Sequence, residues 1–161
     1  MNLKNKRKRI MKGLNELRDQ IHALSKQKGY YFVENEIDNI GIDNRTAIKH
    51  SLFAQKIALI HSELSEAIES DRKNKYSGNK KVKIFEDRFD TISNFMMSLE
   101  SDSIFIKFYE EYIKGNVEEE LSDVIIRTLD LCGHLEIDIQ QYVELKMRYN
   151  GLNKNKNGKM Y

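Results

Sequence analysis

The chain of 161 residues contains no proline and only eight glycines. These are the two residues that most disfavour the interior of a helix. Between the glycines, the sequence runs through long segments rich in Leu, Ile, Glu, Lys and Ala, a composition typical of helices. The near absence of helix-breaking residues therefore predicts an all-α fold.

Apolar residues recur at three- and four-residue spacing in several segments, as they do on one face of an amphipathic helix. Gly29, Gly78 and Gly115 interrupt this pattern. We expect five or six helices, and the candidate segments are about residues 8–28, 45–72, 84–99, 101–114, 117–135 and 138–149. The helices within residues 84–114 are expected to form an insertion. The polar tail, residues 150–161, is expected to be irregular and basic.

The bulk composition indicates one globular domain, residues 1–161, because a chain of this length with 40% hydrophobic residues can bury a core. The 27 basic and 25 acidic side chains nearly cancel, which argues against nucleic acid or a membrane as the main partner. The single cysteine, Cys132, excludes an internal disulfide and a CxxC site. There is no run of about 18 apolar residues and no signal-peptide pattern. We therefore expect a soluble, cytoplasmic protein.

The segment "ELSEAIE", residues 63–69, places acids where a helix should be apolar. At about 100° per residue, Glu63 lies between Leu59 and Ala67, within the apolar face of the predicted helix. Glu66 lies at the edge of that face, and residues three apart on a helix are neighbours. The pair is therefore predicted to point toward the protein interior.

The segment "VEEELSDVIIRTLDL", residues 117–131, repeats this arrangement on a second helix. Glu120 lies within about 40° of Val124 and Leu131 on the helical wheel, and Asp123 lies at the edge of the same face. Asn116 precedes this helix as a plausible N-cap. Each of the two predicted helices thus directs a pair of carboxylates inward.

Carboxylates grouped in a partly dry site repel one another and lose hydration, at a cost of several kcal/mol each unless they protonate or bind cations. Oxygen-only donors match Mg²⁺ or Mn²⁺ better than zinc. A di-iron bundle would need a Glu-x-x-His pair, which neither segment contains. A solvated helix face, with acids that complement the helix macrodipole, is the alternative for each segment alone. Their combination predicts a metal site formed by Glu63, Glu66, Glu120 and Asp123.

The segments "ELSEAIE" and "EELSDVIIRTLDL" resemble the ExxE and ExxD halves of the MazG-like nucleoside triphosphate pyrophosphohydrolases. The ending "LKMRYNGLNKNKNGKMY" is similar to the ending of these proteins. They are all-α enzymes related to dimeric dUTPases and to phosphoribosyl-ATP pyrophosphohydrolase. The resemblance implies a four-helix-bundle-like, MazG-type core with an N-terminal helix and an inserted helical segment.

The resemblance also implies an activity, the Mg²⁺-dependent hydrolysis of a nucleoside triphosphate to a nucleoside monophosphate and pyrophosphate. The metal-binding and catalytic residues that it implies are Glu63, Glu66, Glu120 and Asp123. The phosphate contacts that it implies are Lys146, Asn150 and Lys159. It further implies a homodimer or homotetramer with no nucleic acid or membrane partner.

The chain departs from the family pattern in two places. The separation of Glu66 and Asp123 is longer than is typical, so the helices of residues 84–114 are extra or rearranged and leave the preferred base open. An arginine of the family's ending is replaced by Asn153. Two other functions remain open: a non-catalytic helical interaction protein, and an enzyme of the same fold that acts on dUTP or phosphoribosyl-ATP.

Several neighbouring side chains have structural interpretations. We expect Arg127 to pair with Asp123 or Asp130, one helical turn away. Asn116 and Glu119 have the spacing of a capping box. Glu69 and Glu119 either support the metal site or are solvated helix residues. For His22 and the sequence "YYF", residues 30–32, the alternatives are capping of the first helix and stacking on a base.

Overall fold

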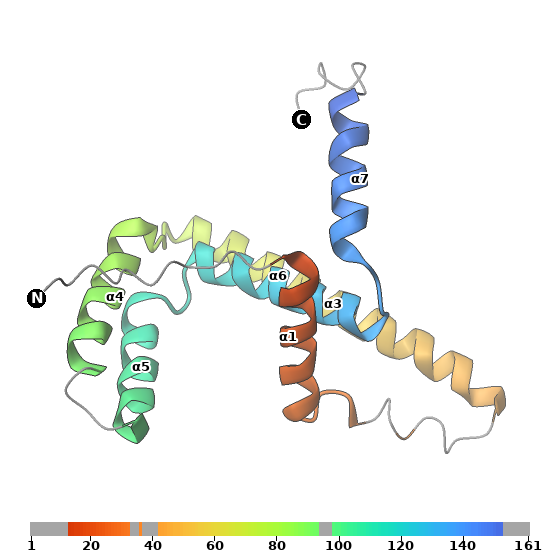
Figure 1. The fold of residues 1–161 in the computed structure, drawn as a ribbon, viewed down its shortest axis with the longest axis horizontal. Helices are drawn as coiled ribbons and strands as arrows, with labels where there is room; N and C mark the ends of the chain where they lie inside the picture. The colour runs from red at the N-terminus through yellow and green to blue at the C-terminus, as the bar shows by residue number, and fades with distance from the viewer. Residues whose placement is uncertain (1–12, 33–35, 37–41, 94–97, 153–161) are drawn as a thin grey trace, which may run out of the picture. The chain divides into compact units, whose positions relative to one another are not determined.

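The computed structural model describes residues 13–32, 36, 42–93 and 98–152, and these residues form six long helices and no strand. The helices are α1 (Leu14–Gln27), α3 (Ile42–Arg72), α4 (Gly78–Ser93), α5 (Ser98–Tyr112), α6 (Val117–His134) and α7 (Ile139–Leu152) (Figure 1). The prediction of an all-α fold is confirmed. In the described part of the chain, no helix is both long enough and apolar enough to cross a membrane.

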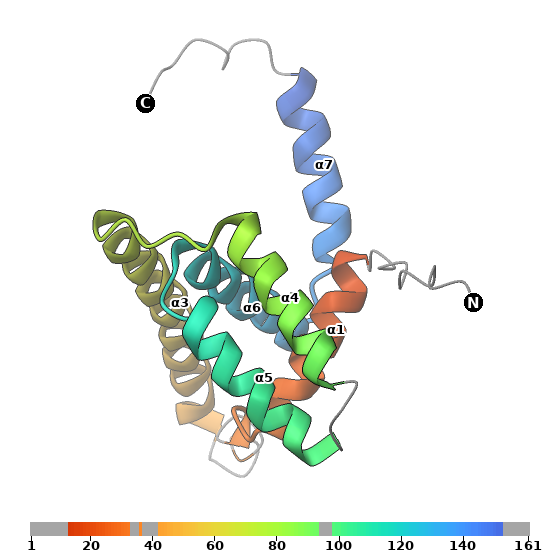
Figure 2. The ribbon, with the colours of Figure 1, turned by 90° about the vertical axis from the view of Figure 1, so that its left-hand side faces the viewer.

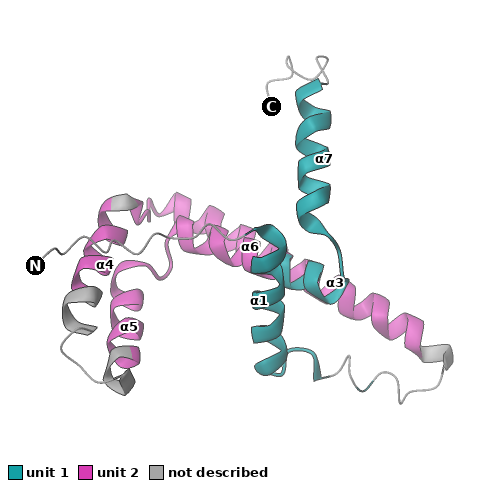
Figure 3. Ribbon diagram, in the orientation of Figure 1, with its two compact units in different colours: residues 1–40, 129–161 teal, residues 41–128 magenta. Residues whose placement is uncertain are grey.

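The chain divides into two compact units (Figure 3). Unit 1 contains residues 1–40 and 129–161, and unit 2 contains residues 41–128. The boundary falls inside α6, between Thr128 and Leu129. The interpretation of residues 1–161 as a single domain stays a prediction, and each unit is described by itself below.

The helix boundaries differ from the sequence prediction where distant contacts or glycines decide them. Helix α4 begins at Gly78 instead of about residue 84. The Glu118 carboxylate accepts hydrogen bonds from the backbone N–H groups of Ser77 (2.9 Å) and Gly78 (2.8 Å), and so caps α4 from 40 residues away. Helix α7 continues through Gly151 to Leu152, although the tail was expected to be irregular from residue 150.

Helices α4 and α5 lie side by side as a hairpin within unit 2 (Figures 1 and 2). The rings of Phe85 and Phe105 meet edge to face at 5.3 Å between centroids, a favourable aromatic geometry. Arg88 donates a hydrogen bond of 2.6 Å to the Tyr112 hydroxyl. These helices are the predicted insertion, and their side chains hold the two helices together.

The end of α3 and the beginnings of α4 and α6 meet in unit 2. The amide nitrogen of Asn116, which is buried, donates to the Ser77 hydroxyl at 2.7 Å. Helix α6 begins at Val117, directly after Asn116, as predicted. The predicted capping box, however, does not form in its usual way. Instead, the Glu119 carboxylate accepts a hydrogen bond from the Gly115 N–H at 2.7 Å, one residue before Asn116. The Asn116 amide nitrogen donates hydrogen bonds to the Ser77 hydroxyl and to the backbone carbonyl of Tyr112 in the preceding turn.

A buried polar network connects α1 with the end of α6 inside unit 1. His22 Nδ1 lies 3.0 Å from Asp130 Oδ1, and the Tyr31 hydroxyl donates to Asp130 Oδ2 at 2.7 Å. Tyr31 is only 2% exposed and stacks on His134 with 4.8 Å between ring centroids. Tyr31 thus covers the end of α1, which supports capping over base stacking, whereas Tyr30 and Phe32 are largely exposed.

Glu118 gives a stability prediction with a defined pH dependence. Burial opposes its ionisation, but the backbone N–H groups of Ser77, Gly78 and Glu118 and the charge of Lys81 together outweigh burial, so the pKa of Glu118 lies below its usual value of 4.5. A lowered pKa means that the ionised carboxylate stabilises the fold above pH 4.5, and that this contribution is lost as pH falls through the folded-state pKa. Glu118→Ala is expected to lose about 1 kcal/mol at pH 7, and less in acid.

Urea unfolding of the parent and of Glu118→Ala at several pH values measures this loss. Glu110→Ala is the control, because Glu110 is exposed and makes an ion pair with Lys114 at 3.3 Å, one turn away. Such a pair is worth only about 0.5 kcal/mol or less. A Glu118→Ala loss that is the same at pH 3 and pH 7 would contradict a charged cap.

Candidate metal centre

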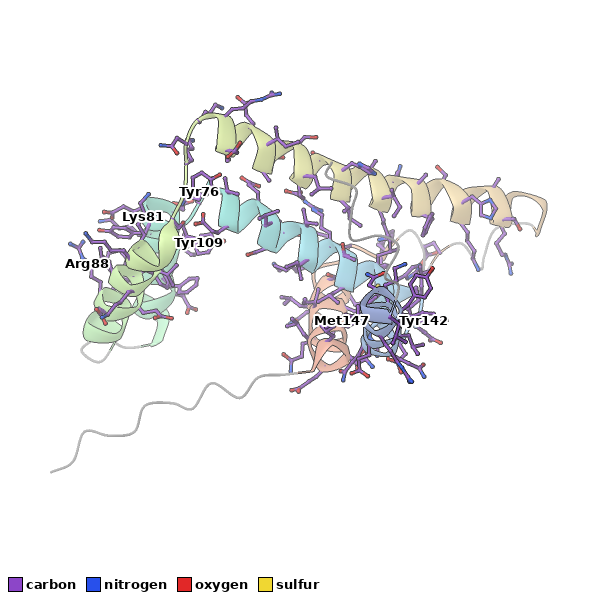
Figure 4. The ribbon with its side chains drawn as sticks, turned by 90° about the horizontal axis from the view of Figure 1, so that it is seen from above. Tyr76, Lys81, Arg88, Tyr109, Tyr142 and Met147 are labelled. Atoms are coloured by element: carbon purple, nitrogen blue, oxygen red, sulfur yellow. The ribbon has the colours of Figure 1, made fainter. Side chains whose placement is uncertain are left out.

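Helices α3 and α6 lie along each other in unit 2 (Figure 4). Acids from the two helices come together there. One carboxylate oxygen from each of Glu63, Glu66 and Glu120 lies within 4.8 Å of the other two. These three residues are called the acidic cluster below. It unites three of the four residues predicted as metal ligands.

The acidic cluster is partly removed from water. Glu63 is 6% exposed and Glu120 is 7% exposed, whereas Glu66 is open to solvent. In the described part of the chain, no hydrogen bond or ion pair satisfies the Glu120 carboxylate. Burial raises the pKa of Glu120, and the negative charges of Glu119, Glu66 and Glu63 raise it further. Glu120 is therefore a largely buried residue whose carboxylate has no counter-charge of its own among the described residues.

Asp123, the fourth predicted ligand, is half-buried and lies outside the 4.8 Å group, one turn further along α6. Burial raises the pKa of Asp123, and the charges of Glu119 and Glu63 add to the effect while Arg127 opposes it. Asp123 thus shares the electrostatic environment of the acidic cluster without belonging to its closest oxygen set.

Arg127 does not have the partner expected from the sequence. Its Nε donates to Oε1 of Glu63 at 2.6 Å, and its Nη2 lies 2.6 Å from the same oxygen. The expected pairing with Asp123 or Asp130 is therefore wrong, since a carboxylate on the neighbouring helix α3 lies closer. This ion pair neutralises one acid of the cluster and uses only one of the two oxygens of Glu63.

The two supporting carboxylates differ from each other. Glu69 is half-exposed and pairs with Lys73 at 3.0 Å and with Arg72 at 3.7 Å, so it is a solvated helix residue. Glu119 instead accepts hydrogen bonds from the Gly115 N–H and, at 3.2 Å, from the hydroxyl of Tyr109 on α5. Local periodicity alone does not reveal the contact with Tyr109, because it joins α5 to α6.

The predicted phosphate contacts lie in the other unit. Lys146 and Asn150 are exposed on α7 in unit 1, one turn apart. The Lys146 ammonium lies 4.9 Å from the centroid of the Tyr149 ring, a cation–π distance. Lys159 lies outside the described residues, as does Asn153.

The donor chemistry of the acidic cluster fits a hard divalent cation. All three donors are carboxylate oxygens, which Mg²⁺ and Mn²⁺ prefer, and the group contains no sulfur or imidazole ligand. A cation would also relieve the repulsion that raises the pKa of Glu120. The Glu120 carboxylate, which has no ion-pair partner among the described residues, is the strongest local reason to expect a cation.

Comparisons with protein-family models, with curated proteins and with solved structures find no match for this chain. The resemblance to MazG-like enzymes therefore stays a prediction based on "ELSEAIE" and "EELSDVIIRTLDL". The proximity of Glu63, Glu66 and Glu120 is a separate observation, because it comes from the positions of their oxygens.

Proposed function

We propose that the protein is a Mg²⁺-dependent nucleoside triphosphate pyrophosphohydrolase. The observation that supports this best is the largely buried residue Glu120, whose carboxylate has no charge partner among the described residues and places an oxygen within 4.8 Å of oxygens of Glu63 and Glu66. The arrangement of these acids on α3 and α6 agrees with the ExxE and ExxD motifs of the MazG-like enzymes that the sequence resembles. Mn²⁺ suits the same donors.

In the proposed reaction, a water oxygen forms a bond to the α-phosphorus while the bond from that phosphorus to the bridging oxygen breaks. Pyrophosphate leaves with the electron pair of the broken bond, and the water proton passes to a carboxylate or to solvent. Mg²⁺, when bound, supplies neutralisation of the triphosphate charge and makes the attacking water more acidic.

The protein's own residues are proposed to bind the cation, to orient its ligands and to contact the phosphates. Glu63, Glu66 and Glu120 hold the cation, with Asp123 beside them as the fourth proposed ligand. Arg127 keeps the Oε1 atom of Glu63 in place, which leaves the other oxygen for the cation. Lys146, Asn150 and Lys159 remain the proposed phosphate contacts.

Assembly and location belong to the same proposal. Apolar side chains of α3 and α6 are about half exposed, including Leu59 (47%), Ile68 (54%) and Ile125 (54%), which supports a homodimer or homotetramer. A cytoplasmic location agrees with the single, unpaired Cys132.

Incubation of the protein with each ordinary and deoxynucleoside triphosphate in millimolar Mg²⁺, followed by product identification, tests the activity. We expect a nucleoside monophosphate and pyrophosphate, and no turnover in EDTA. A nucleoside diphosphate with orthophosphate would contradict the proposal. Selective turnover of dUTP or phosphoribosyl-ATP would identify a relative with a narrower substrate. An inert protein that shows no Mg²⁺-linked stabilisation would favour a helical interaction protein.

A further inference from the structure

Tyr109 connects the predicted insertion with the helix that carries Glu120. It lies on α5 (Figure 4). Its hydroxyl donates to Glu119 Oε1 at 3.2 Å, at the beginning of α6. Burial and the charge of Glu119, which also accepts its hydrogen bond, raise the pKa of Tyr109 to about 12. The hydroxyl therefore keeps its proton, and remains a donor, throughout the neutral pH range.

The position of Glu119 is fixed by two separate donors. The Gly115 N–H holds Oε2 at 2.7 Å, and Tyr109 holds Oε1. The charge of Glu119 follows burial as the next largest influence on the carboxyls of both Glu120 and Asp123. Glu119 is thus a fixed negative charge beside the acidic cluster, although its oxygens lie outside the 4.8 Å group.

The packing of α5 limits how far Tyr109 can move. Its ring stacks on that of Phe105 with 6.0 Å between centroids, and Phe105 meets Phe85 of α4 edge to face at 5.3 Å. The hairpin therefore supports the Tyr109 hydroxyl through a continuous series of aromatic contacts.

We propose that Tyr109 is a positioning residue of the metal site, which holds the Glu119 carboxylate beside Glu120 and Asp123 so that the site binds a divalent cation more tightly. This inference rests on the proposed function. It assigns the α4–α5 hairpin a role in the site, through a side chain that touches neither substrate nor cation.

Residues that orient or surround metal ligands typically change metal affinity by about 10- to 100-fold. Tyr109→Phe removes one of two donors to Glu119, so we expect about a tenfold weaker affinity for Mn²⁺. Glu119→Gln removes the charge but keeps an oxygen that accepts from the Gly115 N–H, so we expect a loss at least as large. Because Tyr109 acts only through Glu119, the double variant is expected to bind no more weakly than Glu119→Gln alone.

Calorimetric titration of the substrate-free protein with Mn²⁺ measures these affinities, and melting in EDTA reports folding. Tyr112→Phe is the matched control, since Tyr112 lies one turn from Tyr109 and its hydroxyl contacts Arg88 and Glu111 rather than Glu119. It is expected to bind Mn²⁺ like the parent. Neither phenylalanine variant is expected to lower the melting temperature enough to explain an affinity change.

Three results would overturn the inference. The first is a Tyr109→Phe variant that binds Mn²⁺ as tightly as the parent. The second is a double variant whose loss of Mn²⁺ binding free energy equals the sum of the losses in the two single variants. Either result is compatible with the proposed function if the parent binds Mn²⁺. A parent that binds no Mn²⁺ overturns the proposed function and this inference together.

Discussion

Glu120→Gln is expected to stabilise the protein in EDTA and to abolish its stabilisation by Mg²⁺. In the parent, the ionisation of Glu120 is opposed by burial and by four neighbouring acids, and the neutral amide removes that penalty. We expect a gain of about 1 kcal/mol, typical of relieved charge repulsion, or about 3 °C in melting temperature for a chain of this size. The pKa of Glu120 is raised, so the gain should be present at neutral pH and disappear as pH falls below 4.5, where both states bind the proton.

Mg²⁺ should reverse the order of the two proteins. At a hundredfold excess over Kd, a ligand that binds only the folded state adds about 2.7 kcal/mol to the parent. The variant lacks one anionic ligand and should gain little. Its turnover is expected to fall by about 100-fold or more, since even residues that merely orient ligands cost up to that amount.

Glu63→Gln provides the contrasting case on the opposite helix. It should lose the Mg²⁺ effect as Glu120→Gln does, but it should destabilise the protein in EDTA, because it weakens the pair with Arg127. The Arg127 side chain is 41% exposed and a glutamine oxygen still accepts its hydrogen bond, so we expect a loss of only about 1 kcal/mol.

Thermal melts of the parent and of each variant in EDTA and in millimolar Mg²⁺ measure both effects. Glu69→Gln is the control on α3, because Glu69 pairs with Lys73 and Arg72 at the surface and should leave the Mg²⁺ shift intact. Equal Mg²⁺ shifts in the parent and in Glu120→Gln would remove Glu120 from the proposed metal site. A Glu120→Gln protein that melts lower than the parent in EDTA would identify Glu120 as a structural carboxylate.

The helices themselves could be predicted from the sequence because their signals are local. The absence of proline and the apolar spacing locate α3 and α6 within a few residues of their observed ends. The beginning of α4 could not be predicted, because its cap is the carboxylate of Glu118, 40 residues further along the chain. A local sequence pattern does not identify a partner that lies so far along the chain.

The same distinction applies to the acidic cluster. Helical periodicity places Glu63 and Glu120 within apolar faces, and both are buried as that position predicts. Periodicity cannot choose between partners on one helix and partners on two helices, so it assigned Arg127 to Asp123 or Asp130 instead of to Glu63. Tyr109 was missed for the same reason, since its contact with Glu119 depends on how the hairpin packs.

Gly133→Ala is expected to be among the most destabilising single changes in unit 1. A Cβ atom at residue 133 would lie 2.6 Å from the Cβ of His22 and 2.9 Å from its Cγ, well inside van der Waals contact. His22 cannot move aside freely, because Asp130 holds its Nδ1 at 3.0 Å and Tyr31 packs against its ring at 4.8 Å. Overpacking of this kind costs about 1–3 kcal/mol, and loss of the hydrogen bond to Asp130 adds about 1 kcal/mol.

Gly151→Ala is the matched control, because it makes the same chemical change in a helix with open space around it. Apart from its chain neighbours and the backbone of its own helix, no heavy atom of the described residues lies within 4 Å of the added Cβ, and the residue belongs to α7. Alanine is the better helix former, so this variant should gain about 0.5 kcal/mol. Urea unfolding should therefore shift in opposite directions for the two variants. If both were stabilised, His22 and Gly133 would have to lie further apart than close packing of α1 against α6 requires, and the His22–Asp130 contact would need re-examination.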